Sequence, residues 1–217
     1  MNHDRSRAII FSFLLILSFQ AFPAPTQWLT GSGANGHYYD LVLGSKTWTA
    51  SRDAAAASSF LGSSGHLVTI TSAAENEFVR STFDASSGGF VWIGASDAAV
   101  EGQWRWMVGP EAGTQFWQGN ASGAATAPYF YANWGPIEPN NASDEDVAAL
   151  NLGATSGGGT LNGQWGDTDI TTNFGGYIVE YSNFTSAIPE PEIYAMLVAG
   201  LGLLGFAARR KKNTLAF

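Results

Sequence analysis

The alternation of apolar and polar positions predicts two helices in the first half of the chain. The first is expected over residues 47–62, where Thr47 can cap the N-terminus, alanine fills the middle and Gly62 can end the helix. The second is expected to begin at Ser72, because Ser72 and Glu75 have the spacing of a capping box. The helical period predicts inward faces of Trp48, Ala55, Ser59 and Phe60 in the first helix and Ala74, Phe78, Val79 and Thr82 in the second.

Short apolar or alternating segments predict strands around these helices. Between residues 109 and 163 the chain is rich in Gly, Asn, Pro and Ser and shows little regular structure apart from residues 147–152, which is typical of a working loop. Two early helices followed by a meander with one long loop predict an α+β fold. The predicted strands cover residues 37–44, 66–71, 90–95, 103–108, 164–167 and 175–181.

Both ends of the chain have the composition of targeting segments. Arg5 and Arg7 precede an apolar run at residues 8–19, which predicts a secretory signal peptide over residues 1–24, with an uncleaved anchor as the alternative. Near the other end, the uncharged residues 193–208 predict a transmembrane helix roughly 24 Å long. The basic residues 209–212 that follow it are expected to stay in the cytoplasm. One domain, residues 25–186, remains between the signal peptide and a tail of residues 187–217.

The net charge of this domain indicates which kinds of partner it can bind. The whole chain carries a formal charge of −8, but residues 25–192 contain four cations against 17 carboxylates, a formal charge of −13. Such an acidic domain is a poor partner for nucleic acid and favours cation binding, with a solvated acidic surface as the alternative. The chain has no cysteine, so it forms no disulfide and its core must supply the stability.

The densest acidic stretch is EPNNASDED, residues 138–146, with four carboxylates and two carboxamides around one proline. Oxygen donors of this kind are the ligands that calcium prefers. Zinc is not favoured, because His37 and His66 lie in separate strand-like segments and no Cys or His pair has zinc-site spacing. The sequence shows no Gly-x-Ser-x-Gly motif and no cysteine nucleophile, so no enzymatic activity is predicted.

These motifs, in this order, resemble a C-type lectin-like domain over residues 37–181. The matching pieces are YY, TW, GHLVTITSAAENEFV, WIGASD, EGQWRW, YANWGPIEPNN, DED, GQWGD and YIVEY. The resemblance implies two helices packed on antiparallel sheets with a long irregular metal-binding loop. It places Trp92, Trp104, Trp106, Trp134 and Trp165 in the core. The family's usual half-cystines would fall near residues 55–57, 147, 170 and 179, which are small or apolar here.

The resemblance also implies two calcium sites and a cis peptide bond between Glu138 and Pro139. The sugar-binding calcium would be held by Glu138, Asn140, Glu145 and Asp167, the first three also contacting sugar. Gly166 stands where the family has an asparagine ligand, so water, Asp169 or Asn162 would have to replace that amide. The accessory calcium would be held by Asp97, Glu101, Asn141 and Asp146, with Glu145 adjoining it.

The tail resembles the PEP-CTERM sorting signal, which combines Pro189, Glu190 and Pro191 with a short apolar helix and a basic cluster. That resemblance implies processing by an exosortase. It also implies initial anchoring in the inner membrane and a final place in the envelope, on the outer surface or in the medium. The alternative is a plain membrane anchor with the same topology.

The predicted function is calcium-dependent binding of extracellular polysaccharide. The EPN form resembles sites for mannose-like or glucose-like hydroxyls, with binding that is weak at one site and strengthened by many copies. The alternative is an adhesion or matrix module that binds protein, in which metal is structural or absent. The intact EPN favours the lectin, and Gly166 favours the module.

Overall fold

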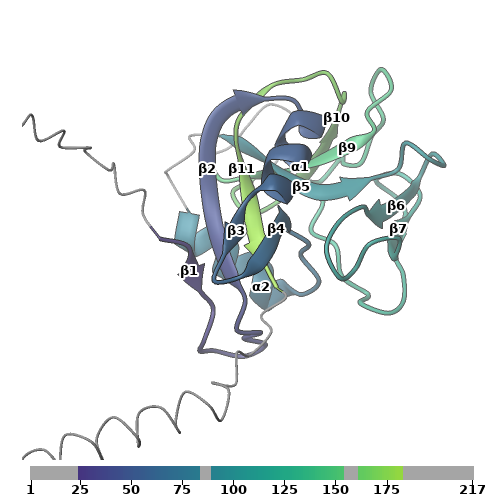
Figure 1. The fold of residues 1–217 in the computed structure, drawn as a ribbon. Helices are drawn as coiled ribbons and strands as arrows, with labels where there is room; N and C mark the ends of the chain where they lie inside the picture. Colours follow the sequence, from purple (N-terminus) through teal and green to yellow (C-terminus); the bar gives the residue numbers. More distant parts are fainter. Residues whose placement is uncertain (1–23, 84–88, 154–160, 183–217) are drawn as a thin grey trace, which may run out of the picture.

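Two helices pack on a large mixed β-sheet in the computed structural model, which describes residues 24–83, 89–153 and 161–182 (Figure 1). This arrangement confirms the predicted α+β class. The described elements are β1 (Thr26–Gln27), β2 (Tyr38–Lys46), α1 (Trp48–Ala57), β3 (Ser59–Phe60), β4 (Ser63–Leu67), α2 (Ala73–Phe83), β5 (Phe90–Ser96), β6 (Gln103–Trp106), β7 (Gln115–Gln118), β8 (Ala124–Ala125), β9 (Val147–Asn151), β10 (Trp165–Thr168) and β11 (Phe174–Tyr181).

The sheet is ordered β1-β2-β11-β5-β6-β7-β8, and further strands pair with its middle. Strand β9 pairs with β5 and carries β10, while β4 pairs with β11 and carries β3. The strands pair antiparallel except where Tyr177 of β11 meets Trp92 of β5 in parallel, and an isolated parallel bridge joins Trp134 to Trp165 of β10. The predicted antiparallel sheets are thus confirmed, with the pairing of β11 and β5 as an exception. Strand β11 ends the described chain, yet it lies in the centre of the sheet.

Helix α1 is shorter than predicted. It begins as expected, since the Thr47 hydroxyl accepts a hydrogen bond from the Ala50 amide. It ends at Ala57 rather than Gly62, because Ser59 and Phe60 leave the helix and pair as β3 with Ser64 and Ser63. The predicted strand at residues 66–71 is accordingly shifted, and β4 occupies Ser63–Leu67.

Helix α2 confirms the predicted N-cap, since the Ser72 hydroxyl accepts from the Glu75 amide. The Glu75 carboxylate, however, accepts from the Thr71 amide and hydroxyl instead of the amide of Ser72. Glu75 is 3% exposed and faces the interior together with Asn76, Val79 and Phe83. Of the predicted inward face, Val79 is buried and Ala74 and Phe78 pack against the core.

The segment predicted as one long loop contains two extra strands. Strand β7 pairs with β6, and β8 pairs with β7, so the sheet extends beyond the expected meander. Phe116 of β7 is fully buried between Trp106 and Trp165, with ring centroids 4.5 and 5.9 Å away. Strand β7 has four residues, of which Phe116 is buried and Trp117 partly buried, and this is too short a pattern for a sequence-based prediction.

Aromatic and branched side chains form two apolar clusters, one on each side of the sheet. The five tryptophans expected in the core are all buried. Ala55, Val147 and Val179 stand where the family's half-cystines would fall, and all three lie in the second cluster, with Ile170 packed against it. Apolar side chains therefore take the four half-cystine positions, and burial of a branched one such as Val147 or Val179 contributes roughly 1.5–3 kcal/mol.

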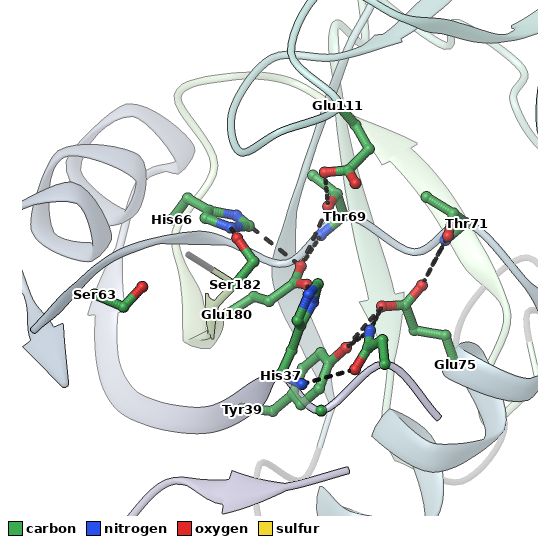
Figure 2. A network of polar contacts seen from close by, with 12 residues as sticks. His37, Tyr39, Ser63, His66, Thr69, Thr71, Glu75, Glu111, Glu180 and Ser182 are labelled. Carbon is green, nitrogen blue, oxygen red and sulfur yellow. Dashed lines mark hydrogen bonds and ion pairs between the residues drawn. The ribbon is translucent and has the colours of Figure 1, made fainter. Parts of the chain in front are cut away.

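A buried polar network around Glu180 of β11 and Glu75 of α2 joins these two elements to β2 and β4 (Figure 2). The Glu180 carboxylate lies 2.6 Å from His37 Nδ1 and accepts from the amide of Thr69. The hydroxyl of Thr69 donates to both Glu180 and Glu111. Beside them, Glu75 accepts a 2.7 Å hydrogen bond from the Tyr39 hydroxyl. Two buried glutamates thus share one region in which His37, 2.6 Å from Glu180, and His66, 4.0 Å from Glu180, are the nearest basic side chains.

This network makes stability depend on pH. Burial, and then the charge of Glu180, raise the pKa of Glu75 to about 7. Burial lowers the pKa of His37, but the hydrogen bond and charge of Glu180 outweigh it and raise that pKa overall. An unfolded glutamate releases its proton near pH 4.5, so between that pH and about 7 the native state binds more protons than the unfolded state. Stability therefore falls as pH rises through this window, and loss of the His37 proton acts in the same direction.

We expect Glu75→Gln to flatten this pH dependence. The amide keeps the shape but does not ionise, so the wild type should lose on the order of 2–3 kcal/mol more than the variant between pH 5 and 7.5. Urea unfolding at a series of pH values measures this. Glu77→Gln on the same helix is the control, because Glu77 is exposed and paired with Arg80. Parallel curves for wild type and Glu75→Gln would contradict the assignment.

Candidate functional site

Three strand ends bring the predicted acidic residues together. Ser96 at the end of β5 is opposite Val147 at the start of β9, and Ala148 of β9 is opposite Asp167 of β10. Asp97 therefore follows one strand where Asp146 precedes its neighbour. Asp167 lies one strand further along. The loop of residues 138–146 enters β9 at the same end of the sheet.

The first group at this end consists of Asp97, Glu101 and Asp146. One carboxylate oxygen from each lies within 4.8 Å of the others. The backbone joins two of them, since the Asp97 amide donates to the Asp146 carbonyl at 3.2 Å. Asp97 Oδ2 accepts from the Gly102 amide at 2.9 Å, whereas its Oδ1 is buried and has no hydrogen-bond partner.

Electrostatics make this group unfavourable without a cation. Burial, followed by the charges of Glu101 and Asp146, raises the pKa of Asp97 to about 7. Burial, with the charges of Asp144 and Asp169, also raises the pKa of Asp146. A buried carboxylate oxygen that faces two other carboxylates and lacks a donor is relieved by a proton or by a metal ion.

The second group is built around Glu138, Asn140 and Asp167. The Glu138–Pro139 peptide bond is cis, as the resemblance implies. The Asn140 side-chain amide donates to the Glu138 carboxylate. Asp167 accepts from the backbone amide of Asn140 at 3.0 Å and from that of Asn141 at 2.7 Å. These bonds fix the loop on strand β10.

Glu145 joins the same group through the turn that follows. The Ala142 amide donates to both the Glu145 carboxylate and the Asn140 side-chain oxygen. Asn141, predicted as an accessory-site ligand, accepts from the Glu145 amide at 2.7 Å and so lies beside the second group. The four residues predicted for the sugar-binding calcium are thus connected by a continuous set of hydrogen bonds through this loop.

The second group also carries raised pKa values. Burial, contact with the Asp167 carboxyl and the charge of Glu145 raise the pKa of Glu138 to about 8. Burial, and then the charge of Asp167, raise the pKa of Glu145. The charge of Asp167 therefore opposes the ionisation of both Glu138 and Glu145.

Gly166 leaves room beside Glu138. A β-carbon at this position would lie 3.8 Å from Glu138 Cγ and 3.6 Å from the Phe90 ring, which are ordinary contacts. Of the two substitutes considered for the missing amide, Asp169 accepts from the Thr171 amide and hydroxyl. Asn162 contacts Arg80 and the Leu152 carbonyl. A β-carbon at position 166 would therefore fit between Phe90 and Glu138 without a close contact.

Sequence reasoning did not identify the Gly102 amide as a partner of Asp97. The available signal was the Glu101-Gly102 pair, since Gly102 adopts a positive φ of 72° that closes the turn after β5. Nor did it show that Ser143 and Asp144 adopt positive φ, which folds the acidic run back on itself.

Comparison with known proteins identifies this architecture. The family model of the lectin C-type domain matches residues 45–172, more than half of the chain. The chain belongs to the C-type lectin domain family. Domains of this family generally bind calcium, and the acidic group around Asp97 is a possible site for the ion. The family and its fold are carbohydrate-binding and non-enzymatic, in agreement with the predicted lack of catalysis.

Relatives of this lectin domain come from distant sources. Halomucin of Haloquadratum walsbyi is 37% identical over 164 residues, 72% of this chain and 2% of halomucin. Human C-type lectin domain family 17, member A is 38% identical over 90 residues, 42% of this chain and 19% of that protein. The chain thus spans a small part of either relative. The crystal structure of the cow CD23 carbohydrate-recognition domain, determined with a GlcNAc2Man3 oligosaccharide present, has a TM-score of 0.50 and 25% identity, covering 75% of this chain and 98% of that domain.

A second family model, the PEP-CTERM protein-sorting motif, matches residues 187–211 of this lectin-domain protein. This signal implies export to the cell envelope or surface. Within the described ranges, no helix has the length and apolar character needed to cross a bilayer. The predicted transmembrane helix at residues 193–208, the sorting residues Pro189, Glu190 and Pro191, and residues 1–23 of the predicted signal peptide lie outside those ranges.

The residues present fit calcium. All ligand atoms in both groups are carboxylate or amide oxygens, which this cation prefers, and the unpaired Oδ1 of Asp97 offers a free ligand atom.

We expect millimolar calcium to raise the melting temperature by several degrees and Asp97→Asn to reduce that shift. Differential scanning calorimetry in chelated and calcium-containing buffer measures it. The control is Asp53→Asn, an exposed aspartate paired with Arg52. An unchanged shift in Asp97→Asn would remove this residue from the site.

Proposed function

We propose that this protein is an exported, cell-surface or extracellular lectin that binds polysaccharide in a calcium-dependent manner, with a preference for mannose-like or glucose-like hydroxyls. One observation carries the proposal. Glu138, Asn140, Glu145 and Asp167 come from two segments more than 20 residues apart, and one loop connects them by hydrogen bonds beside the Glu138–Pro139 bond.

In this proposal the second group binds the sugar. Glu138, Asn140, Glu145 and Asp167 hold calcium, which when bound supplies positions for two vicinal hydroxyls. Glu138 and Asn140 already contact each other, so one offers an acceptor and the other a donor to those hydroxyls. Asp167 keeps the loop in place through two backbone amides. Glu145 closes the site on the side of the turn.

The first group, Asp97, Glu101 and Asp146, holds the end of the loop against the sheet. Asp97, Glu101 and Asp146 hold the accessory calcium, with Asn141 linking them to the sugar-binding group through Glu145. Asp146 directly precedes β9, so neutralising this group fixes the end of the loop to β5 and β9. A bound ion here lowers the repulsion that burial and neighbouring carboxylates create.

A shallow site of this kind binds one sugar weakly, with Kd around millimolar or about −4 kcal/mol. Useful retention of polysaccharide then comes from many copies on a surface. The sorting motif supports this setting, because an exosortase substrate would be displayed in the envelope or released outside it. Initial anchoring through residues 193–208 is part of the same proposal. The oligosaccharide present with the cow CD23 domain supports a glycan as ligand.

The second candidate is an adhesion or matrix module that binds protein. Gly166 favours it, because the site lacks the amide oxygen that the family's asparagine supplies. A glycan array probed with and without chelator separates the two functions. Binding that disappears with chelator supports the lectin, and the absence of any glycan signal supports the module.

We expect the exchange Glu138→Gln with Asn140→Asp to change sugar preference. The swap reverses which side chain donates and which accepts, as in the QPD form of galactose-binding relatives. Binding to a mannose polymer should fall more than about tenfold, or 1.4 kcal/mol, and binding to a galactose polymer should rise. Surface plasmon resonance on both immobilised polymers measures this. A variant that keeps its mannose affinity would remove these residues from the sugar site.

We expect Gly166→Asn to raise sugar affinity, because a β-carbon at this position lies 3.8 Å from Glu138 Cγ and the amide oxygen that it carries can complete the ligand set. Gly166→Ala is the matched control, since it fills the same space without an oxygen. Isothermal titration with calcium and then with mannose measures both steps. Equal affinities for the two variants would contradict the proposed ligand set.

A further inference from the structure

The loop end of the sheet, where residues 138–146 enter β9, carries more negative charge than two calcium ions neutralise. Six carboxylates belong to the two groups described above, and two further ones, Asp144 and Asp169, flank them. Two dications offset four of these eight charges and leave four. A sugar bound here therefore meets a negative surface even when both ions are in place. The eight residues are Asp97, Glu101, Glu138, Asp144, Glu145, Asp146, Asp167 and Asp169.

The two flanking carboxylates lie beside the ligand groups and are accessible. Asp169 directly follows β10 and is partly exposed. It accepts hydrogen bonds from the amide and the hydroxyl of Thr171, both at 2.6 Å, so the turn holds its carboxylate in one place. Asp144 is exposed and directly precedes Glu145. Burial raises the pKa of Asp146, and the charges of Asp144 and Asp169 raise it further, so both are close enough to act on the first group.

Basic side chains do not compensate this charge. Arg52 pairs with Asp53 on α1, and Arg80 pairs with Glu77 on α2. Arg105 donates to a backbone carbonyl and to two glutamines. Among the residues that the structure describes, no ion pair joins a basic side chain to any of the eight carboxylates. Positive charge at the loop end must therefore come from outside the protein.

A buried oxygen atom shows independently that this end of the sheet is suited to positive charge. Asp97 is 2% exposed, and its Oδ1 has no donor although it belongs to a group of three carboxylates. A buried carboxylate oxygen without a donor is costly unless a cation compensates it. A metal ion satisfies this buried position. The exposed carboxylates of Asp144 and Asp169 stay outside it and remain available to a ligand.

The charge of the sugar decides which ligand suits this surface. A neutral sugar offers hydroxyls to calcium but leaves the flanking carboxylates uncompensated. A uronate or a sulfated sugar adds like charge, which a negative surface disfavours. A hexosamine with a free amine presents hydroxyls together with an ammonium group on a neighbouring carbon, and it satisfies both requirements. N-acetylation of the same amine removes the charge and keeps the ring hydroxyls.

We propose that the polysaccharide bound at the second group carries free amino groups, and that Asp144 and Asp169 select it by pairing with its ammonium groups. The inference rests on the proposed function, since hydroxyls of the same chain bind calcium. It assigns selectivity to carboxylates outside the proposed calcium ligands. Repetition of the amine along the polymer adds many such pairs, which strengthens binding to a surface of many copies.

Two polymers with one backbone test this selectivity. A β-1,4-linked glucosamine polymer and its fully N-acetylated form share their ring hydroxyls and differ in charge. In mildly acidic buffer of low ionic strength with saturating calcium, the full-length protein should bind the free-amine polymer at least about tenfold more tightly, as measured by surface plasmon resonance. The preference should shrink in about 0.5 M NaCl, because salt screens exposed charges. A mannose polymer on a third channel reports calcium-dependent sugar binding by itself.

Single substitutions locate the selectivity. Asp144→Asn and Asp169→Asn should each lower the ratio of the two affinities at least about threefold, and the ratio cancels any change in calcium binding. Asp53→Asn is the matched control, because it removes one charge from an exposed aspartate on α1 and should leave the ratio unchanged.

Three results overturn the proposal. They are a wild-type ratio near one, an equal fall of the ratio in Asp53→Asn, and amine-polymer binding that persists in chelator, which indicates simple ion exchange on an acidic surface. If the mannose polymer binds with calcium while the ratio is near one, the proposed function stands and this inference fails. If no polymer binds in a calcium-dependent manner, both fail.

Discussion

The structure depends on how it accommodates carboxylates that have no cationic partner. Strand pairing places Asp97, Asp146 and Asp167 at one end of the sheet, and the loop adds Glu138 and Glu145. The ion pairs formed by arginine are elsewhere, Arg52 with Asp53 and Arg80 with Glu77. Arg105 donates to the Gly113 carbonyl and to two glutamines. Each acidic group must therefore take up protons or a divalent cation, and the raised pKa values are the electrostatic signature of that requirement.

The two acidic regions of the molecule compensate their carboxylates in different ways. At the loop end, carboxylate oxygens point at one another, and Asp97 Oδ1 has no donor at all. At the other end, Glu75 and Glu180 receive donors from tyrosine, threonine and histidine side chains. Within the described residues, the buried carboxylate oxygen that lacks a donor is at the loop end. The glutamate network instead ties β2 and β11 to α2, which makes it a structural element with a titration of its own.

Sequence patterns predicted the elements that local chemistry determines. Thr47 and Ser72 cap their helices as expected, and the apolar run of β5 is a buried strand. The misses come from contacts that the helical pattern does not encode, some of them close in sequence. Ser59 leaves α1 because β4 supplies a partner strand, and Glu75 turns inward because Tyr39 and Thr71 supply donors. Thr71 is a neighbour of Glu75 in the sequence, whereas Tyr39 is 36 residues away and could not be inferred from the residues around Glu75.

The candidate site was predicted from the order of motifs, but its internal arrangement was not. The resemblance named Glu138, Asn140, Glu145 and Asp167, and the structure shows them linked through backbone amides that no motif specifies. Asn141 illustrates the limit. Its residue type suited the accessory group, whereas its positive φ of 51° turns its oxygen to the Glu145 amide. Backbone conformation in an irregular loop is set by closure of the whole loop, which composition alone does not reveal.

The position of β11 explains how the sorting motif can follow the folded lectin domain without being part of it. This strand pairs with β2, β4 and β5 and so lies in the middle of the sheet, where its Glu180 also joins the buried network. It ends at Tyr181, before the sorting motif begins at residue 187. All the strand pairing and core packing described here therefore precede the motif in the chain. Cleavage within the tail would remove the sorting motif without removing any of these interactions. Sorting and sugar binding can therefore be separate properties of one polypeptide.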